Sequence, residues 1–305
     1  MKSYQRIFVF LLLVLLLTVV ISPWAAALWN SLIETRPQWH EYRYPFSHIF
    51  GRLFMVLGVV LFFPCRHLLK IESLSQLGLR PNRQWHCDFA RGALIALASF
   101  VAVVSLMSLL HVFTPFFRLS LSTAVERCFK ALLTALTVGV LEEIFFRGVV
   151  FKGLLEDLRP AAAFTLSSLF YAAIHFIKPA EQFSVAGLDP WAGIRYLTGA
   201  FQPFLDPASL LPGLFGLFLI GLVLAYAFLR TGSLYLSMGL HAGWVFGLKT
   251  IRVFGDYRRE DLGWLFGSLE PKLVSGIAGW IAILAVCVTV HYMTRKQPGL
   301  SNQEK

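Results

Sequence analysis

Two carboxylates and a guanidinium lie within a strongly apolar stretch of the sequence. Residues 140–148 read Val-Leu-Glu-Glu-Ile-Phe-Phe-Arg-Gly, so that Glu142, Glu143 and Arg147 stand among Leu, Val, Ala and Phe. On membrane-insertion scales, each charge at the centre of an apolar helix costs about 2.5–3.5 kcal/mol. Three such charges therefore need partners or a chemical role.

Helical geometry separates the roles of these three side chains. Successive residues turn by about 100°, so Glu143 and Arg147 lie about 40° apart on one face, at the i,i+4 spacing that favours an ion pair. Glu142 points about 100° away from Glu143. We therefore expect a structural Glu143–Arg147 pair and a Glu142 that faces a cavity as a general base.

Two histidines lie in other apolar stretches of the chain. His175 shares a helical face with Ser168 and Tyr171, and His241 shares one with Ser237. A single histidine in an apolar helix usually just hydrogen-bonds to a neighbour. Three apolar helices that each carry ionisable groups indicate more, because such groups turn inward and pair instead of facing lipid. A buried ion-pair network that only orders the bundle is the alternative.

The composition sets the environment of these residues. Of 305 residues, 57% are hydrophobic and only 14% are charged, and the mean hydropathy is +0.66. A chain this apolar does not expose an ordinary water-soluble surface. The net charge is +10, but Lys and Arg are scattered through the loops, so no nucleic-acid partner is expected. The four cysteines show no metal-ligand spacing.

The hydropathy pattern predicts an all-α, polytopic membrane protein in which about eight transmembrane helices surround an intramembrane polar cavity. We expect one membrane domain over residues 1–305 and no internal repeat. The predicted spans are 7–28, 52–69, 90–113, 131–151, 161–178, 211–229, 233–250 and 273–293.

Two other segments bear on membrane association. Lys2 and Arg6 precede an apolar run, which also resembles a cleaved signal peptide, but the run continues to Leu28 and favours a retained first helix. Residues 179–210 contain Trp191 and Phe201, which suit the headgroup region, so this segment is expected on the membrane surface. An irregular loop is the alternative there.

The ordered motifs resemble the CPBP membrane proteases, also called Abi proteins, which include the type II CAAX prenyl endopeptidases of the Rce1 kind. The family pattern is Glu-Glu-x-x-x-Arg, then aromatic-x-x-x-His, then His-x-x-x-Asn or Asp. Glu142, Glu143 and Arg147 fill the first motif, Tyr171 and His175 resemble the second, and His241 begins the third. The resemblance covers a core of about residues 74–250.

One position departs from the family pattern. The Asn or Asp expected four residues after His241 falls on Val245, whose side chain cannot form a hydrogen bond. In the family this residue is thought to help hold the oxyanion. The Trp244 indole N–H or the Ser237 hydroxyl could substitute for it.

The resemblance implies hydrolysis of a peptide bond in a membrane-associated peptide or protein. Glu142 with His175 would activate a water, His241 would stabilise the oxyanion, Glu143 would complete the catalytic set, and Arg147 and Tyr171 would support it. Glu142, His175 and His241 could also bind zinc, although the absence of His-Glu-x-x-His favours a metal-free mechanism. The expected location is the inner membrane of a prokaryotic cell, with lipid as a partner. The alternatives are a non-catalytic scaffold or bacteriocin-immunity type protein, and a proton-coupled carrier.

Overall fold

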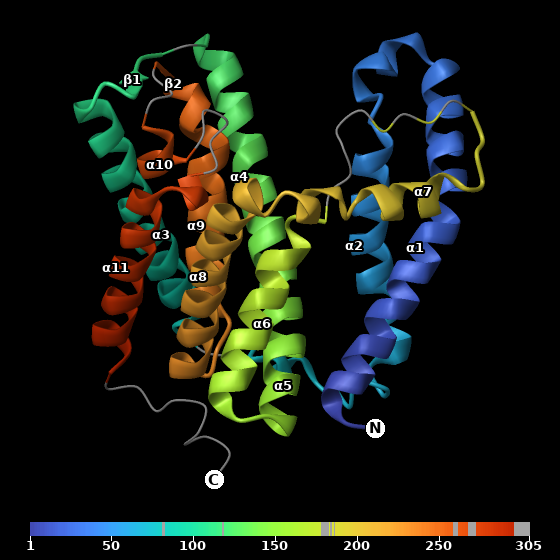
Figure 1. Ribbon diagram of the computed structural model, residues 1–305, viewed down its shortest axis with the longest axis horizontal. Coiled ribbons are helices and arrows are strands. Elements are labelled where there is room, and N and C mark those ends of the chain that lie inside the picture. Colours follow the sequence, from blue (N-terminus) through green and yellow to red (C-terminus); the bar gives the residue numbers. More distant parts are fainter. Residues whose placement is uncertain are drawn as a thin grey trace. The chain divides into compact units, whose positions relative to one another are not determined.

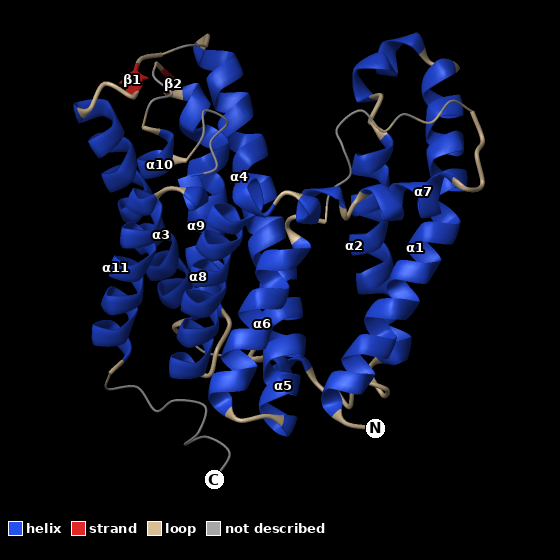
Figure 2. Ribbon diagram, viewed as in Figure 1, coloured by secondary structure: helices blue, strands red, loops and turns tan. Residues whose placement is uncertain are grey.

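The computed structural model describes residues 1–80, 83–117, 119–177, 183, 185, 187–258, 262–267 and 273–295. Nearly all regular structure in this part of the chain is helical, as predicted (Figure 2). The chain forms two compact units, one of residues 1–72 and 173–210 and one of residues 73–172 and 211–305. The expected single membrane domain stays a prediction.

The first unit is built on two apolar helices, α1 (Ser3–Glu34) and α2 (Phe46–Cys65), joined through the 3-10 helix η1 (Pro37–Tyr42). A short helix, α7 (Ala192–Gly199), runs across both of them (Figure 1) and is followed by the 3-10 helix η4 (Gln202–Leu205). The core of this unit consists of Ala26, Phe46, Phe50, Ala192 and Tyr196.

The second unit contains the remaining elements. Its helices are η2 (Leu74–Leu77), α3 (Trp85–Leu109), α4 (Leu121–Glu143), the π-helix η3 (Ile144–Phe151), α5 (Lys152–Asp157), most of α6 (Pro160–Ile174) and α8 (Pro207–Thr231), α9 (Tyr235–Thr250), η5 (Ile251–Val253), α10 (Gly263–Phe266), η6 (Leu273–Ser275) and α11 (Ile277–Thr294). Two short antiparallel strands, β1 (Phe113–Pro115) and β2 (Gly255–Tyr257), pair with Phe113 opposite Tyr257.

Helix α9 is the central element of the second unit. Eleven of its 16 residues are buried, and it packs against both α3 and α4. Glycines allow these close contacts. A Cβ atom on Gly239 would lie 2.0 Å from the Phe89 carbonyl oxygen of α3, and one on Gly139 of α4 would lie 3.1 Å from the Ala242 backbone nitrogen. The close packing fixes the position of His241 on α9.

We predict that Gly239→Ala destabilises the protein by about 1–3 kcal/mol, because the new methyl group forces α3 and α9 apart. Gly58→Ala is the matched control. No atom lies within 4 Å of a Cβ at Gly58, so this change should leave stability unchanged or raise it by up to about 1 kcal/mol through helix propensity. Denaturant unfolding in detergent micelles measures both variants. Equal stability of the two would contradict the close contact.

The predicted count of about eight transmembrane spans is not confirmed. Within the described residues, five helices are long and apolar enough to cross a membrane: α1, α2, α3, α8 and α11. The other three predicted spans also contain helices. However, α4 carries five charged residues, and α6 and α9 have only 15 and 16 residues. A helix of 16 residues is about 24 Å long, short of a hydrocarbon core of about 30 Å.

Candidate active site

The predicted motif of Glu142, Glu143 and Arg147 lies where an α-helix becomes a π-helix. Helix α4 ends at Glu143, and η3 begins at Ile144. The i,i+4 spacing of Glu143 and Arg147 predicts a regular α-helix here, and no residue pattern in the sequence indicates the change. Single π-helical turns occur frequently at functional sites, because the wider turn changes the direction of the side chains.

Glu143 is the buried centre of the site. Its side chain is completely buried, and its Oε1 atom accepts a hydrogen bond of 2.7 Å from Arg147 Nη1. The pair has the i,i+4 spacing that the sequence predicted. The same oxygen lies 2.9 Å from His241 Nδ1 on α9. One carboxylate oxygen therefore connects the end of α4, the π-helix and α9.

Arg147 connects this carboxylate to two further helices. Its Nη2 atom donates a hydrogen bond of 3.3 Å to the Gly221 carbonyl of α8. Its guanidinium carbon lies 4.6 Å from the centre of the Tyr171 ring on α6, a cation–π contact. A buried guanidinium needs such partners, because an unpaired buried charge is strongly destabilising. The predicted supporting role of Arg147 and Tyr171 in a catalytic site stays a prediction.

The sequence does not indicate that Gly221 belongs to the site. It contributes a backbone carbonyl, which every residue has, so no residue type could have signalled it. Its lack of a side chain also matters, because a Cβ there would lie 2.9 Å from the Ser168 Cβ of α6. The glycine thus allows α6 and α8 to approach closely where Arg147 is bound.

His241 is oriented by its contact with Glu143. An ionised carboxylate can only accept hydrogen bonds, so Nδ1 donates to Glu143. The other ring nitrogen, Nε2, lies 3.8 Å from Glu142 Oε2, too far for a hydrogen bond but close enough for electrostatic attraction. The Tyr171 ring meets the imidazole edge-on, with ring centres 6.0 Å apart. These contacts direct Nε2 towards Glu142.

The two adjacent carboxylates differ in their access to solvent. The Glu142 side chain is 26% exposed, whereas that of Glu143 is 0% exposed. Glu143 is occupied by Arg147 and His241. Glu142 is therefore the more exposed of the two carboxylates, although its Oε2 atom is buried, and its role as a general base stays a prediction.

His175 lies outside the helix that was expected to contain it. Helix α6 ends at Ile174, and His175 is a half-buried turn residue one position later. The predicted fifth span extended to residue 178, which lies outside the described residues. His175 belongs to the first unit, while Glu142 and His241 belong to the second. Its expected role beside Glu142 stays a prediction.

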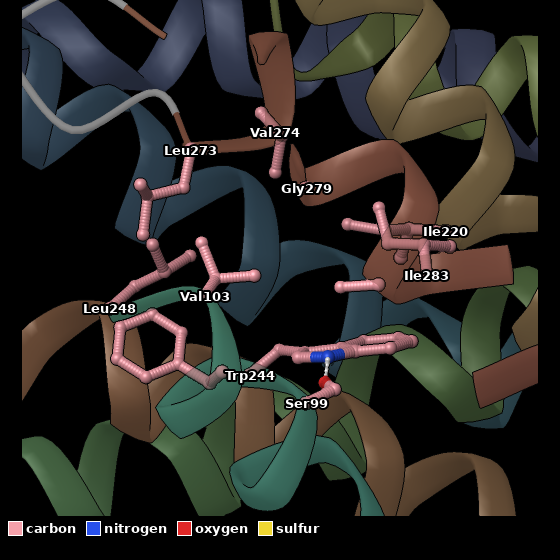
Figure 3. A pocket seen from close by; sticks show the side chains of 11 residues that line it. Ser99, Val103, Ile220, Trp244, Leu248, Leu273, Val274, Gly279 and Ile283 are labelled. Carbon is pink, nitrogen blue, oxygen red and sulfur yellow. Dashed lines mark hydrogen bonds between the residues drawn. The ribbon is translucent and has the colours of Figure 1, made fainter. Parts of the chain in front are cut away.

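The two candidate substitutes for the missing Asn or Asp already have hydrogen-bond acceptors. The Ser237 hydroxyl donates to the Leu234 carbonyl at 2.9 Å. The Trp244 indole N–H donates to Ser99 Oγ at 3.1 Å, inside an apolar pocket between α3, α8, α9 and α11 (Figure 3). Val245 is half-buried. Neither donor therefore replaces the family residue in this conformation.

A metal centre was the second chemistry predicted for these residues. In the part of the chain that the structure describes, no group of three or more His, Cys, Asp or Glu side chains has the arrangement needed to hold a metal ion. Zinc binding by Glu142, His175 and His241 stays a prediction.

The fold and the site together define a class of protein. Apolar helices of membrane-spanning length accompany a buried cluster of carboxylate, imidazole and guanidinium groups. Inside a membrane, ionisable groups of this kind mark functional sites. The chain is a multi-pass membrane protein with a buried polar cluster.

The family comparison is consistent with this class. A family model described as Type II CAAX prenyl endopeptidase Rce1-like matches residues 124–247. This segment contains all the predicted site residues, from Glu142 to His241, and the match confirms the resemblance to the CPBP, Rce1-like family over these residues. The family is one of proteases. No curated protein and no solved structure matches the chain.

Proposed function

We propose that this protein is an intramembrane endopeptidase that hydrolyses a peptide bond in a membrane-associated peptide or protein. One observation carries the proposal. Glu143 is held by Arg147 at 2.7 Å and by His241 at 2.9 Å, which leaves the accessible Glu142 beside His241 Nε2 at 3.8 Å. A partly exposed carboxylate next to an oriented imidazole is an arrangement suited to the activation of water.

In the proposed reaction, Glu142 removes a proton from a water as the water attacks the peptide carbonyl carbon. The carbonyl oxygen becomes an oxyanion, which an N–H at His241 Nε2 stabilises. Glu142 then gives its proton to the amide nitrogen, and the C–N bond breaks to leave a carboxylic acid and an amine, between which the remaining water proton then passes to give a carboxylate and an ammonium group. No covalent intermediate with the protein is formed.

The charges of the cluster support the assigned role of His241. Glu142 and Glu143 carry two negative charges and Arg147 carries one positive charge, so the three groups together are negative. The proposed role requires a proton on each ring nitrogen of His241, and in that form the four-residue cluster has no net charge. His241 then donates from Nδ1 to Glu143 and has a second N–H at Nε2 for the oxyanion.

The test is cleavage by purified protein reconstituted in liposomes. The substrates are membrane-associated peptides with and without a C-terminal CAAX sequence, and mass spectrometry identifies both products. The wild type should cleave at least one peptide, and His175→Ala should cleave it more slowly if His175 assists Glu142. No cleavage of any peptide, together with normal cellular function of Glu142→Ala, would contradict the enzyme proposal.

A non-catalytic scaffold or immunity-type protein of the same fold is the second candidate. Val245 favours it, as do the existing hydrogen bonds of Ser237 and Trp244, because they leave the oxyanion with fewer donors. The scaffold depends on the shape of the protein and not on Glu142. A Glu142 variant that folds and functions normally in cells would therefore support the scaffold or immunity-type protein over the peptidase.

We also predict that activity does not depend on zinc. The proposed steps use only Glu142 and His241, so kcat/KM should stay within about twofold of its starting value after stringent chelation. Metal content is measured on the same sample. Loss of activity on chelation, with recovery on adding zinc, would replace the glutamate mechanism by a zinc mechanism.

The proposed setting is the inner membrane of a prokaryotic cell. The substrate would reach the site from the lipid, because the contacts of Arg147 extend to α8, a helix long and apolar enough to cross a membrane.

A further inference from the structure

The short helix α7 of the first unit has two different faces. On its inner face, Ala192, Gly193 and Tyr196 are buried. A Cβ on Gly193 would lie 2.1 Å from the Val19 carbonyl oxygen of α1, so the two helices are in close contact. The Tyr196 ring lies 4.5 Å from that of Phe50 and 5.4 Å from that of Phe46 on α2. The position of α7 on α1 and α2 is therefore fixed by packing.

The outer side of this segment is apolar and exposed. Trp191 is 70% exposed, Ile194 is 48% exposed, and after the helix Phe201 and Leu205 are 50% and 84% exposed. Arg195 lies on the same side and forms an exposed ion pair with Asp189. A tryptophan and an arginine beside aliphatic side chains are typical of membrane interfaces, where amphipathic side chains are partly in water and partly in lipid.

The contacts of α7 with α2 indicate its position relative to the hydrocarbon core of a membrane. Helix α2 has 20 residues and is long and apolar enough to cross a membrane. Twenty residues extend about 30 Å, the thickness of the hydrocarbon core. Phe46 and Phe50 form the first turns of α2, so their contact with Tyr196 lies near one boundary of the hydrocarbon core.

The direction of α7 agrees with this depth. The helix runs across α1 and α2 and not along them (Figure 1). If α1 and α2 cross the membrane, α7 lies in its plane. Leu16 and Val20 lie next to Val19, where α1 contacts α7, and both are apolar and exposed as well.

From this position we propose that residues 191–205 form an in-plane membrane anchor that binds the phospholipid bilayer. Trp191, Ile194 and Phe201 insert at the boundary between headgroups and acyl chains, and Arg195 lies at the level of the lipid phosphates. Interfacial helices of this kind are buried by roughly 5–10 Å at that boundary. The inference does not depend on the proposed peptidase activity.

Site-directed fluorescence in liposomes tests the anchor. Ile194→Cys is introduced after Cys65, Cys87, Cys128 and Cys287 have been replaced by serine, and the new thiol is labelled with an environment-sensitive fluorophore. Quenching is compared between a phospholipid with a nitroxide near its glycerol backbone and one with a nitroxide at its acyl-chain end. Val56→Cys, exposed in the middle of α2, and Ala192→Cys, buried on the inner face of α7, are the controls.

The label at position 194 should be quenched more strongly by the shallow nitroxide, and the label at position 56 more strongly by the deep one. A label at 194 that only aqueous iodide quenches would mean that α7 faces water. A label at 194 that neither lipid nor iodide quenches would mean that a protein partner covers this side. Either result would contradict the proposal that residues 191–205 bind the bilayer.

A second measurement keeps the native cysteines, in case their replacement prevents folding. A photoreactive benzoylphenylalanine is placed at position 194 of the otherwise unchanged chain in liposomes. Irradiation should give a mass increase of one phospholipid. Crosslinks to protein alone, or to no component, would contradict lipid contact.

Discussion

Replacement of Glu142 by glutamine is expected to lower kcat/KM by about 10²–10⁴-fold, the usual contribution of a general base. Glutamine has nearly the same size and can still form hydrogen bonds, but its amide does not accept the proton of the attacking water. Since the Glu142 side chain is 26% exposed, the change should leave the fold intact. Steady-state cleavage of the best peptide substrate in liposomes measures the loss, and unfolding in detergent checks the stability.

Glu126→Gln is the matched control for this experiment. Glu126 lies on the same helix, α4, but is exposed and paired with Lys130. Its replacement should leave kcat/KM and stability unchanged. If Glu142→Gln kept more than about a tenth of the wild-type activity, Glu142 would not be the general base.

Glu143→Gln distinguishes the role of Glu143 from that of Glu142. Glu143 holds both Arg147 and His241, so its replacement should lower activity and also destabilise the fold. Glu142→Gln should lower activity alone. A loss of stability in Glu143→Gln but not in Glu142→Gln would indicate that Glu143 orients its neighbours and that Glu142 takes part in the reaction.

The sequence predicted the contacts that depend on one helix and left out those that depend on several. The Glu143–Arg147 pair follows from i,i+4 spacing, and the greater access of Glu142 follows from its different direction on the helix. The choice of Glu143, and not Glu142, as the partner of His241 requires the packing of α9 on α4. Close contacts at glycines set that packing, and hydropathy carries no information about it.

The number of spans shows a similar limit of sequence patterns. Hydropathy located helices at all eight predicted places, because apolar residues mark buried and lipid-facing helices alike. It did not predict the lengths. Helix α6 ends at Ile174 and places His175 in a turn, and α9 is short and surrounded by other helices. A buried helix need not match the membrane thickness. Its apolar residues alone therefore do not show whether it crosses the membrane.

Replacement of Arg147 by methionine is expected to destabilise the protein by about 3–5 kcal/mol, because it leaves the Glu143 carboxylate buried without its cation. Both side chains of the pair are almost completely buried, at 1% and 0% exposure. The change also removes the hydrogen bond to the Gly221 carbonyl and the contact with Tyr171. Denaturant unfolding in detergent micelles measures the free energy of unfolding.

The chain contains its own control for this prediction. Glu126 and Lys130 form a second i,i+4 pair on α4, with the same order of charges, but both side chains are exposed. Water stabilises the remaining charge at an exposed site, so Lys130→Met should cause no measurable change in stability. The comparison of the two variants therefore isolates the effect of burial.

The double variant Glu143→Gln/Arg147→Met tests the cause of the instability. With the carboxylate also neutralised, no uncompensated charge remains, so the double variant should be more stable than Arg147→Met alone. If the double variant were less stable by the sum of the two single effects, the residues would not be coupled. The destabilisation would then come from lost packing around α6 and α8. Arg147 would stabilise the fold through the volume of its side chain and not as the counter-ion of Glu143.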